Sequence, residues 1–155
     1  QPEDLEKLRF YAETAPSLDS LYGLSRALEH ALSERVWLKS GAYLVIQPTE
    51  ALTVIDVNTG KYDGHKKPKE TFLHINLEAA REAARQIRLR NLSGIILVDF
   101  IDLEEQESKE LLMSVLSKAL KEDPVKTVLV DMTPLGLVEI TRKKVRRTLK
   151  EQASQ

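Results

Sequence analysis

The order of patterns in the second half of the chain constrains the fold more than any other feature of the sequence. The apolar run IILVDF at 95–100 is followed by the amphipathic stretch DLEEQESKELLMSVLSKALKED and then by the apolar run in PVKTVLVDM. A strand, a helix and a strand in succession predict a parallel pair joined by a right-handed crossover. Earlier, three apolar bursts predict an antiparallel meander over about 35–39, 42–47 and 51–57. We therefore expect an α/β fold with a mixed β-sheet flanked by helices.

Helices are predicted on either side of this meander. Leucines and alanines at helical spacing in SLDSLYGLSRALEHALSERVW predict a helix over about 19–34. The stretch NLEAAREAARQIRLRNL is the strongest helix, and Asn76 is its expected N-cap. Residues 59–70 between meander and helix are expected to form a polar, lysine-rich loop. A chain of 155 residues suits one domain with a core of its own, and its apolar runs are too short to span a bilayer.

Polar side chains stand where two apolar strands end. Asp56 and Asn58 share one face of the strand TVIDVN because side chains alternate along a strand, and Asp99 ends the strand IILVD. Ligands of open α/β sheets bind at the carboxyl ends of strands. If the two strands are neighbours, the carboxylates repel each other, and a Mg²⁺ ion would relieve this repulsion. Loop capping stays open for both, and Asp102 is predicted to be a helix N-cap in a capping box with Glu105.

Charge and composition leave a nucleic acid partner open without demanding one. The formal net charge is −1, but positive charge gathers in the loop after Asn58 and in the tail TRKKVRRTLK, where a phosphate-backbone partner and a solvated face are equally compatible. Arg81, Arg85 and Arg88 are expected to pair with nearby glutamates. Aromatic residues make up only 5%, which does not indicate a base-stacking platform. The chain has no cysteine, so no thiolate zinc site is expected within it.

Three blocks in order resemble the catalytic core of the ribonuclease E/G family. They are TEALTVIDVNTG, NLEAAREAARQIRLRNLSGIILVDFIDLE and LGLVEITRKKVR, and the resemblance covers roughly residues 18–148. It implies a deoxyribonuclease-I-like catalytic subdomain at 35–150, preceded at 1–34 by a helical segment that ends a ribonuclease-H-like subdomain and followed by a tail at 151–155. The chain would then be a fragment of a longer enzyme, without the family's domain for RNA binding or its sensor for the RNA 5′ end.

The resemblance also implies a function and a site. The family hydrolyses single-stranded RNA during RNA processing and decay in the cytoplasm, with Mg²⁺ as cofactor and Mn²⁺ as an expected substitute. Asp56 and Asp99 map to the metal-binding aspartates, and Asn58 to the asparagine that positions the phosphate or the attacking water. Charge and position suggest Lys61 and Lys126 as RNA contacts, and the full-length protein is expected to form a homo-oligomer.

Two other functions remain compatible with the sequence. The first is an RNA-binding or assembly fragment that is inactive without its missing domains. The second is a different Mg²⁺-dependent phosphoesterase built on the same fold.

Overall fold

A computed structural model of the chain describes residues 7–12, 15–60 and 68–154. The chain divides into two compact units, Gln1–Ala31 and Leu32–Gln155. The first unit carries the short helix α1 (Leu18–Tyr22) and most of α2 (Leu24–Leu32). The predicted single helix over 19–34 is therefore interrupted at Gly23, which takes the left-handed conformation at the end of α1.

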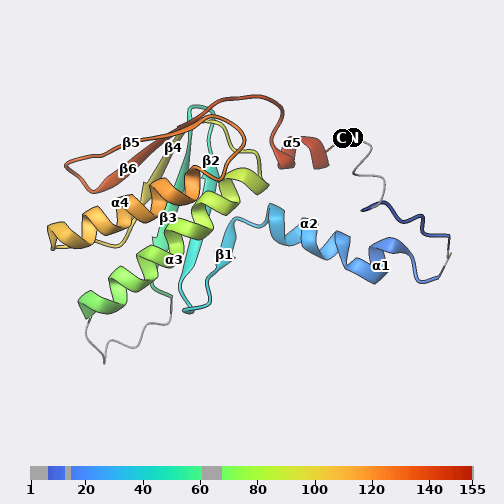
Figure 1. Ribbon diagram of the computed structural model, residues 1–155, viewed down its shortest axis with the longest axis horizontal. Coiled ribbons are helices and arrows are strands. Elements are labelled where there is room, and N and C mark those ends of the chain that lie inside the picture. Colours follow the sequence, from blue (N-terminus) through green and yellow to red (C-terminus); the bar gives the residue numbers. More distant parts are fainter. Residues whose placement is uncertain (1–6, 13–14, 61–67, 155) are drawn as a thin grey trace. The chain divides into compact units, whose positions relative to one another are not determined.

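The second unit is built on one mixed six-stranded sheet (Figure 1). Its strands follow the spatial order β1-β2-β3-β4-β6-β5. They are β1 (Arg35–Trp37), β2 (Tyr43–Pro48), β3 (Leu52–Asn58), β4 (Gly94–Asp99), β5 (Thr127–Met132) and β6 (Leu137–Arg142). The first three form the predicted antiparallel meander, and β3 pairs with β4 in parallel.

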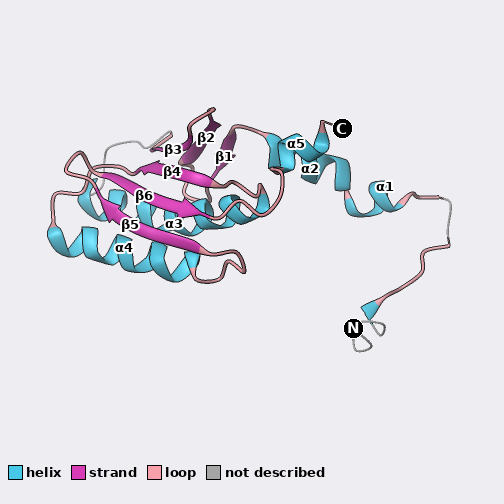
Figure 2. Cartoon of the chain, turned by 90° about the horizontal axis from the view of Figure 1, so that it is seen from above, coloured by secondary structure: helices cyan, strands magenta, loops and turns pink. Residues whose placement is uncertain are grey.

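Two long helices, α3 (Pro68–Leu89) and α4 (Gln106–Leu120), pack against each other and cover one face of the sheet (Figure 2). Small alanines on α3 bring that helix close to the strands, and leucines on α4 fill the space beside it. Alternate residues of the central strands meet these helices and are fully buried; they include Leu44, Ile46, Ile55, Ile96, Val98, Val138 and Ile140. The residues between them point to the opposite face, where Ile95, Val128 and Val130 remain about half exposed.

The parallel strands predicted from the second half of the chain are not neighbours. Strands β4 and β5 do run in the same direction, since each pairs antiparallel with β6, but β6 lies between them. The hydrogen-bonded parallel pair is instead β3 and β4, which α3 connects. The order of strand, helix and strand in the sequence correctly predicts that β4 and β5 run in the same direction. It does not predict which strands are neighbours, because pairing partners are chosen across the whole sheet.

Both long helices begin at positions that differ from the prediction. Helix α3 starts eight residues before Asn76, so Asn76 is an interior residue and not the N-cap. Helix α4 starts after Glu105, and Asp102 lies outside it. A short helix, α5 (Leu149–Ala153), follows the last strand and is capped by a Thr148–Glu151 capping box. Within the described residues, no helix combines the length and apolar character that crossing a membrane requires.

Candidate active site at the carboxyl ends of β3 and β4

Asp56 and Asp99 lie directly beside each other in the sheet. Strands β3 and β4 are parallel neighbours, and their register pairs Asp56 with Asp99. Neighbouring strands are about 4.8 Å apart, and side chains in register point to the same face. Both carboxylates therefore project from adjacent strands at the carboxyl ends of the only parallel pair formed by the described strands. This is the edge at which open α/β sheets bind ligands.

Asn58 is held against Asp56 by a hydrogen bond. Its Nδ2 donates to Oδ2 of Asp56 over 2.7 Å. The two residues alternate with the buried Ile55 and Val57, so they project from the face of β3 that the helices do not cover. The bond fixes the orientation of the Asp56 carboxylate and leaves its other oxygen available to a ligand.

The charge of the pair alters the acidity of Asp99. Partial loss of hydration raises the pKa of the Asp99 carboxyl, and the negative charges of Asp56 and Asp102 raise it further. Like charges that share a small volume favour either proton uptake or a bound cation. The arrangement therefore has the electrostatic character of a cation site.

Asp102 does not cap α4, contrary to the sequence-based expectation. The N-cap of α4 is Glu105, whose side chain makes no capping hydrogen bond. Asp102 is exposed in the loop after β4. It lies close to Gly136, since a Cβ atom added to that glycine would be 3.8 Å from Oδ1 of Asp102. Tertiary packing of α4 evidently outweighs the local start signal, which is worth only about 1 kcal/mol.

Asn76 fixes the loop that follows Asp99 and carries Asp102. The side chain is fully buried in α3, where its Nδ2 donates to the carbonyl oxygen of Ile101 over 2.7 Å. Its Oδ1 accepts from the Ile101 backbone N–H over 3.0 Å. Because Ile101 lies between Asp99 and Asp102, this pair of hydrogen bonds ties the site loop to the helix layer. The prediction of an N-cap at Asn76 is wrong, since a polar amide before an amphipathic run fits both roles.

Of the two lysines predicted to contact RNA, the structure describes only Lys126, and it lies away from the aspartates. Lys61 lies outside the described residues. Lys126 directly precedes Thr127, the first residue of β5. Thr127 pairs with Arg142, and Arg142 pairs with Gly94, so Lys126 lies at the end of the sheet where β4 begins. Five residues of strand, about 17 Å, separate that end from Asp99. The structure therefore does not bring Lys126 to the aspartate pair.

Two other parts of the basic surface are already paired with acidic residues. Arg142 is buried and bonded to Asp123 over 2.8 Å, so this residue of the basic tail is structural. Lys69, at the end of the predicted basic loop, lies in α3 and contacts Glu104 over 2.8 Å. Arg142 is therefore committed to the protein interior, whereas the ion pair of Lys69 is exposed to solvent.

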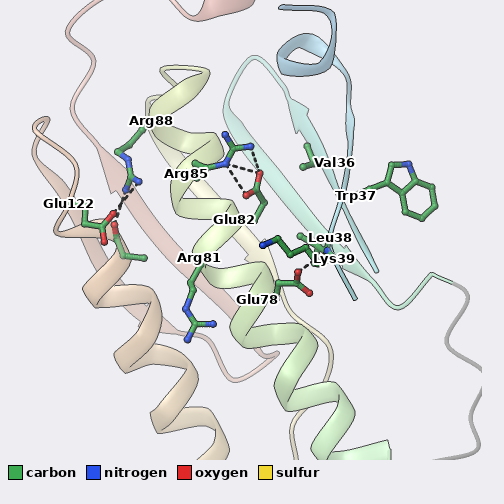
Figure 3. Close-up of a pocket in the computed structure, with 11 residues that line it drawn as sticks. Val36, Trp37, Leu38, Lys39, Glu78, Arg81, Glu82, Arg85, Arg88 and Glu122 are labelled. Atoms are coloured by element: carbon green, nitrogen blue, oxygen red, sulfur yellow. Dashed lines mark hydrogen bonds and ion pairs between the residues drawn. The ribbon is translucent and has the colours of Figure 1, made fainter. Parts of the chain in front are cut away.

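The arginines of α3 line a groove on the helix side of the sheet, with a volume of about 590 Å³ (Figure 3). Arg85 forms the expected ion pair with Glu82, at 2.8 Å. Arg88 bonds to Glu122 at 3.3 Å and to the Ala119 carbonyl oxygen, whereas Arg81 donates to the Leu77 carbonyl oxygen. The expected pairing with glutamates is therefore confirmed for Arg85 and Arg88, but the hydrogen bond of Arg81 goes to a backbone carbonyl oxygen. The groove lies on the face opposite to Asp56.

The available donors favour one class of cation. Among the described residues, no group of three or more histidine, cysteine or acidic side chains could hold a metal ion. Asp56 and Asp99 supply two carboxylates, with Asn58 beside them. Zinc sites use three or four protein ligands, whereas Mg²⁺ binds through one or two carboxylates and keeps several waters. The residues present therefore fit Mg²⁺.

Comparison with known proteins identifies the family of the chain. The family model described as "Ribonuclease E/G family" matches residues 1–145. The chain is 45% identical over 148 residues to ribonuclease G of Haemophilus influenzae, covering 96% of this chain and 30% of that protein. It is 43% identical to ribonuclease G of Escherichia coli, again over 148 residues, which are 96% of this chain and 30% of that protein. It is also 45% identical over 134 residues to ribonuclease E of a Nostoc species, covering 86% of this chain and 19% of that protein. Although it spans under a third of these relatives, the chain belongs to the ribonuclease E/G family.

Proposed function

We propose that this chain carries the catalytic site of a Mg²⁺-dependent endoribonuclease that hydrolyses phosphodiesters in single-stranded RNA. The observation that carries the proposal is the register of Asp56 with Asp99 at the carboxyl ends of two parallel strands. Membership of a family of ribonucleases supports the substrate class. Mn²⁺, which also prefers oxygen ligands, is expected to replace Mg²⁺.

Each residue of the site has a distinct part in the proposed reaction. Asp56 and Asp99 would hold the cation through their carboxylate oxygens. When bound there, Mg²⁺ lowers the pKa of a water molecule and neutralises charge that develops on the phosphate. Asn58 keeps the Asp56 carboxylate in place through its Nδ2 bond. The second N–H and the carbonyl oxygen of the Asn58 amide can still bond a phosphate oxygen or the attacking water.

The proposal is tested by cleavage of an unstructured oligoribonucleotide at a series of Mg²⁺ concentrations. Asp56→Asn and Asp99→Asn each remove a charged oxygen ligand, and we expect each to lower the cleavage rate by at least about a hundredfold, because loss of mere supporting contacts at metal sites costs 10–100-fold. Asn58→Ala is expected to cost about 10–100-fold for the same reason.

Asp131→Asn is the matched control, because Asp131 is an exposed aspartate on β5 and only bonds to the backbone of Met132. It should cleave at the parental rate. Cleavage that persists in both Asp56→Asn and Asp99→Asn would refute the site. Tight RNA binding by the parent chain without Mg²⁺-dependent cleavage would identify a binding fragment, and equal cleavage of DNA would identify a broader phosphoesterase.

A further inference from the structure

An aromatic pair lies on the edge of the sheet next to the aspartate site. Trp37 on β1 and Tyr43 on β2 are in register, and their ring centroids are 5.1 Å apart at an interplanar angle of 58°. The guanidinium of Arg35 lies 4.4 Å from the Tyr43 ring centroid and 5.7 Å from that of Trp37. Trp37 is 60% exposed. These three residues form a cationic aromatic surface, which we call the Trp37 platform.

The Trp37 platform faces the same side of the sheet as the aspartates. The register continues from Trp37 to Tyr43 and from Tyr43 to Asn58, so the three residues form one cross-strand row. Tyr43 alternates with the buried Leu44, as Asn58 alternates with Val57, and both therefore point away from the helices. In Figure 3 the Trp37 ring likewise lies on the far side of β1 from the α3 side chains.

Distance and charge suit a ligand that spans the platform and the aspartates. At about 4.8 Å between strands, the backbone of Tyr43 is one step from Asn58 and that of Trp37 is two. Arg35 is exposed, and among the described residues no carboxylate forms an ion pair with it. The platform thus offers a flat apolar ring and an uncompensated positive charge beside the proposed cleavage site.

A simple packing role explains only part of this arrangement. Cross-strand aromatic pairs stabilise sheets, and the contact between Trp37 and Tyr43 has that effect. It does not explain why the largest apolar side chain in the chain stays mostly exposed at the edge strand, or why no acidic partner of Arg35 is found among the residues that the structure describes. A ligand with a planar π-system and a phosphate satisfies both groups, since bases stack on aromatic rings and on guanidinium planes.

We propose that Trp37, Tyr43 and Arg35 form a base-stacking subsite for an unpaired nucleotide adjacent to the phosphodiester at Asp56 and Asp99. This inference rests on the proposed function, because it names the substrate contact of that same site. Trp37 stacks on the base, and Arg35 contacts the neighbouring phosphate. In a duplex the bases are already stacked on one another, so the subsite selects single strands. Stacking accepts any base, and the subsite therefore adds affinity with little sequence preference.

The fluorescence of Trp37 gives a direct test, because it is the only tryptophan in the chain. The Asp99→Asn variant is titrated with a single-stranded oligoadenylate, which it should bind without cutting. We expect the emission of Trp37 to be quenched to saturation. An abasic ribose-phosphate oligomer of the same length should bind more weakly and leave the emission nearly unchanged. Equal quenching by both oligomers, or RNA binding without any quenching, would overturn the subsite.

Substitutions provide the second measurement. Trp37→Leu is expected to weaken oligoadenylate binding about tenfold, the lower part of the range for one stacked base, and Trp37→Phe should restore most of the loss. Tyr22→Leu, which removes another exposed aromatic from the first unit, is the control and should bind like the parent.

The two proposals fail in distinguishable ways. Parental binding and cleavage in Trp37→Leu would refute the subsite while leaving the aspartate site intact. Base-dependent quenching in a parent chain that never cleaves RNA would support the subsite and refute the proposed catalysis. Binding of oligoadenylate and the abasic oligomer with equal affinity would refute the subsite whatever the cleavage result.

Discussion

Replacing Asn76 with leucine separates the support of the site loop from the general stability of α3. Asn76 is fully buried and exchanges two hydrogen bonds with the backbone of Ile101, at 2.7 and 3.0 Å. Leucine has a similar volume and fits a helix, so the change removes the hydrogen bonds without leaving a large cavity. The backbone N–H and carbonyl of Ile101 then lose their partners.

The cost follows from the two groups left without partners. An unsatisfied buried donor or acceptor costs about 1–3 kcal/mol. Because Ile101 is only partly buried, water can compensate in part, and we expect Asn76→Leu to lower the free energy of unfolding by about 2–4 kcal/mol. Urea unfolding followed by circular dichroism measures this loss.

The loop should also lose its position, and this effect distinguishes Asn76 from an ordinary core residue. Ile101 lies two residues after Asp99, and misplacement of a reacting group by about 1 Å can cost roughly a hundredfold in rate. We expect Asn76→Leu to reduce cleavage of oligoribonucleotides by about 10–100-fold at a temperature where the variant is fully folded. The Mg²⁺ concentration needed for half-maximal cleavage should rise as well.

Gln86→Leu is the matched control in the same helix. Gln86 is buried too, but its hydrogen bonds join it to Glu82 in α3 and to Arg90, the residue that follows α3. This variant should lose stability and keep the parental Mg²⁺ requirement. If Asn76→Leu loses stability but keeps full activity, or if Gln86→Leu loses as much activity as Asn76→Leu, the reasoning about the loop is wrong.

Two further predictions concern stability alone. Burial raises the pKa of the Asp123 carboxyl, but hydrogen bonds from Arg142, Val125 and Thr127 outweigh it and hold the pKa below its usual value. A lowered carboxyl pKa adds stability that is present above about pH 4 and lost as pH falls below it. Asp123→Asn should lower the free energy of unfolding by about 3–5 kcal/mol at neutral pH, because it leaves a buried arginine unpaired. Urea unfolding between neutral pH and about pH 3 should also show a smaller loss of stability with acid than in the parent. An equal loss of stability with acid in the two proteins would contradict this. Gly60→Ala should destabilise the chain by more than about 1 kcal/mol, because its positive φ of 65° disfavours alanine and the new Cβ would meet the Gly41 carbonyl oxygen. Gly41→Ala shares a positive φ, of 87°, but has open space around it, so equal losses in thermal unfolding of the two variants would rule out the clash.

Side-chain placement along β3 was predictable because it depends on one local rule. Alternation along a strand assigns Asp56 and Asn58 to one face, and the structure confirms it. The meeting of Asp56 with Asp99 was predicted only on the condition that their strands are neighbours, and the register confirms the condition. The first fact follows from the strand alone, whereas the second also needs the order of the strands in the sheet.

The errors share a different cause. The sequence predicts helix caps at Asn76 and Asp102, because a short polar side chain before an amphipathic run is a good start signal. In the structure α3 begins at Pro68 and α4 at Gln106, and Asn76 instead bonds to a backbone 25 residues away. Such a contact leaves no local pattern. The insertion of β6 between β4 and β5 is likewise a choice among distant partners.

The Trp37 platform was missed because a composition of 5% aromatic residues says nothing about clustering. The turn between β1 and β2 sets the pairing of Trp37 with Tyr43, and so determines whether two scattered rings become one surface. A signal did exist, since two aromatic residues flank a glycine-containing turn at equal distance from it. Hairpin register, rather than aromatic content, is the property to examine when a stacking surface is sought.

One face of the sheet packs in the core, and the other face carries the residues of the proposed site. On the helix side, Ile55 and Val57 pack in the core, and Asn76 holds the site loop from the same side. On the other side, the same strand presents Asp56 and Asn58 in register with the next strands. Because a strand keeps this alternation strictly, residues that bind substrate can change without repacking the core. Substitutions on the open face should therefore alter RNA affinity and cleavage with little loss of stability, and Asn76 should be the exception, since it lies in the core and supports the site.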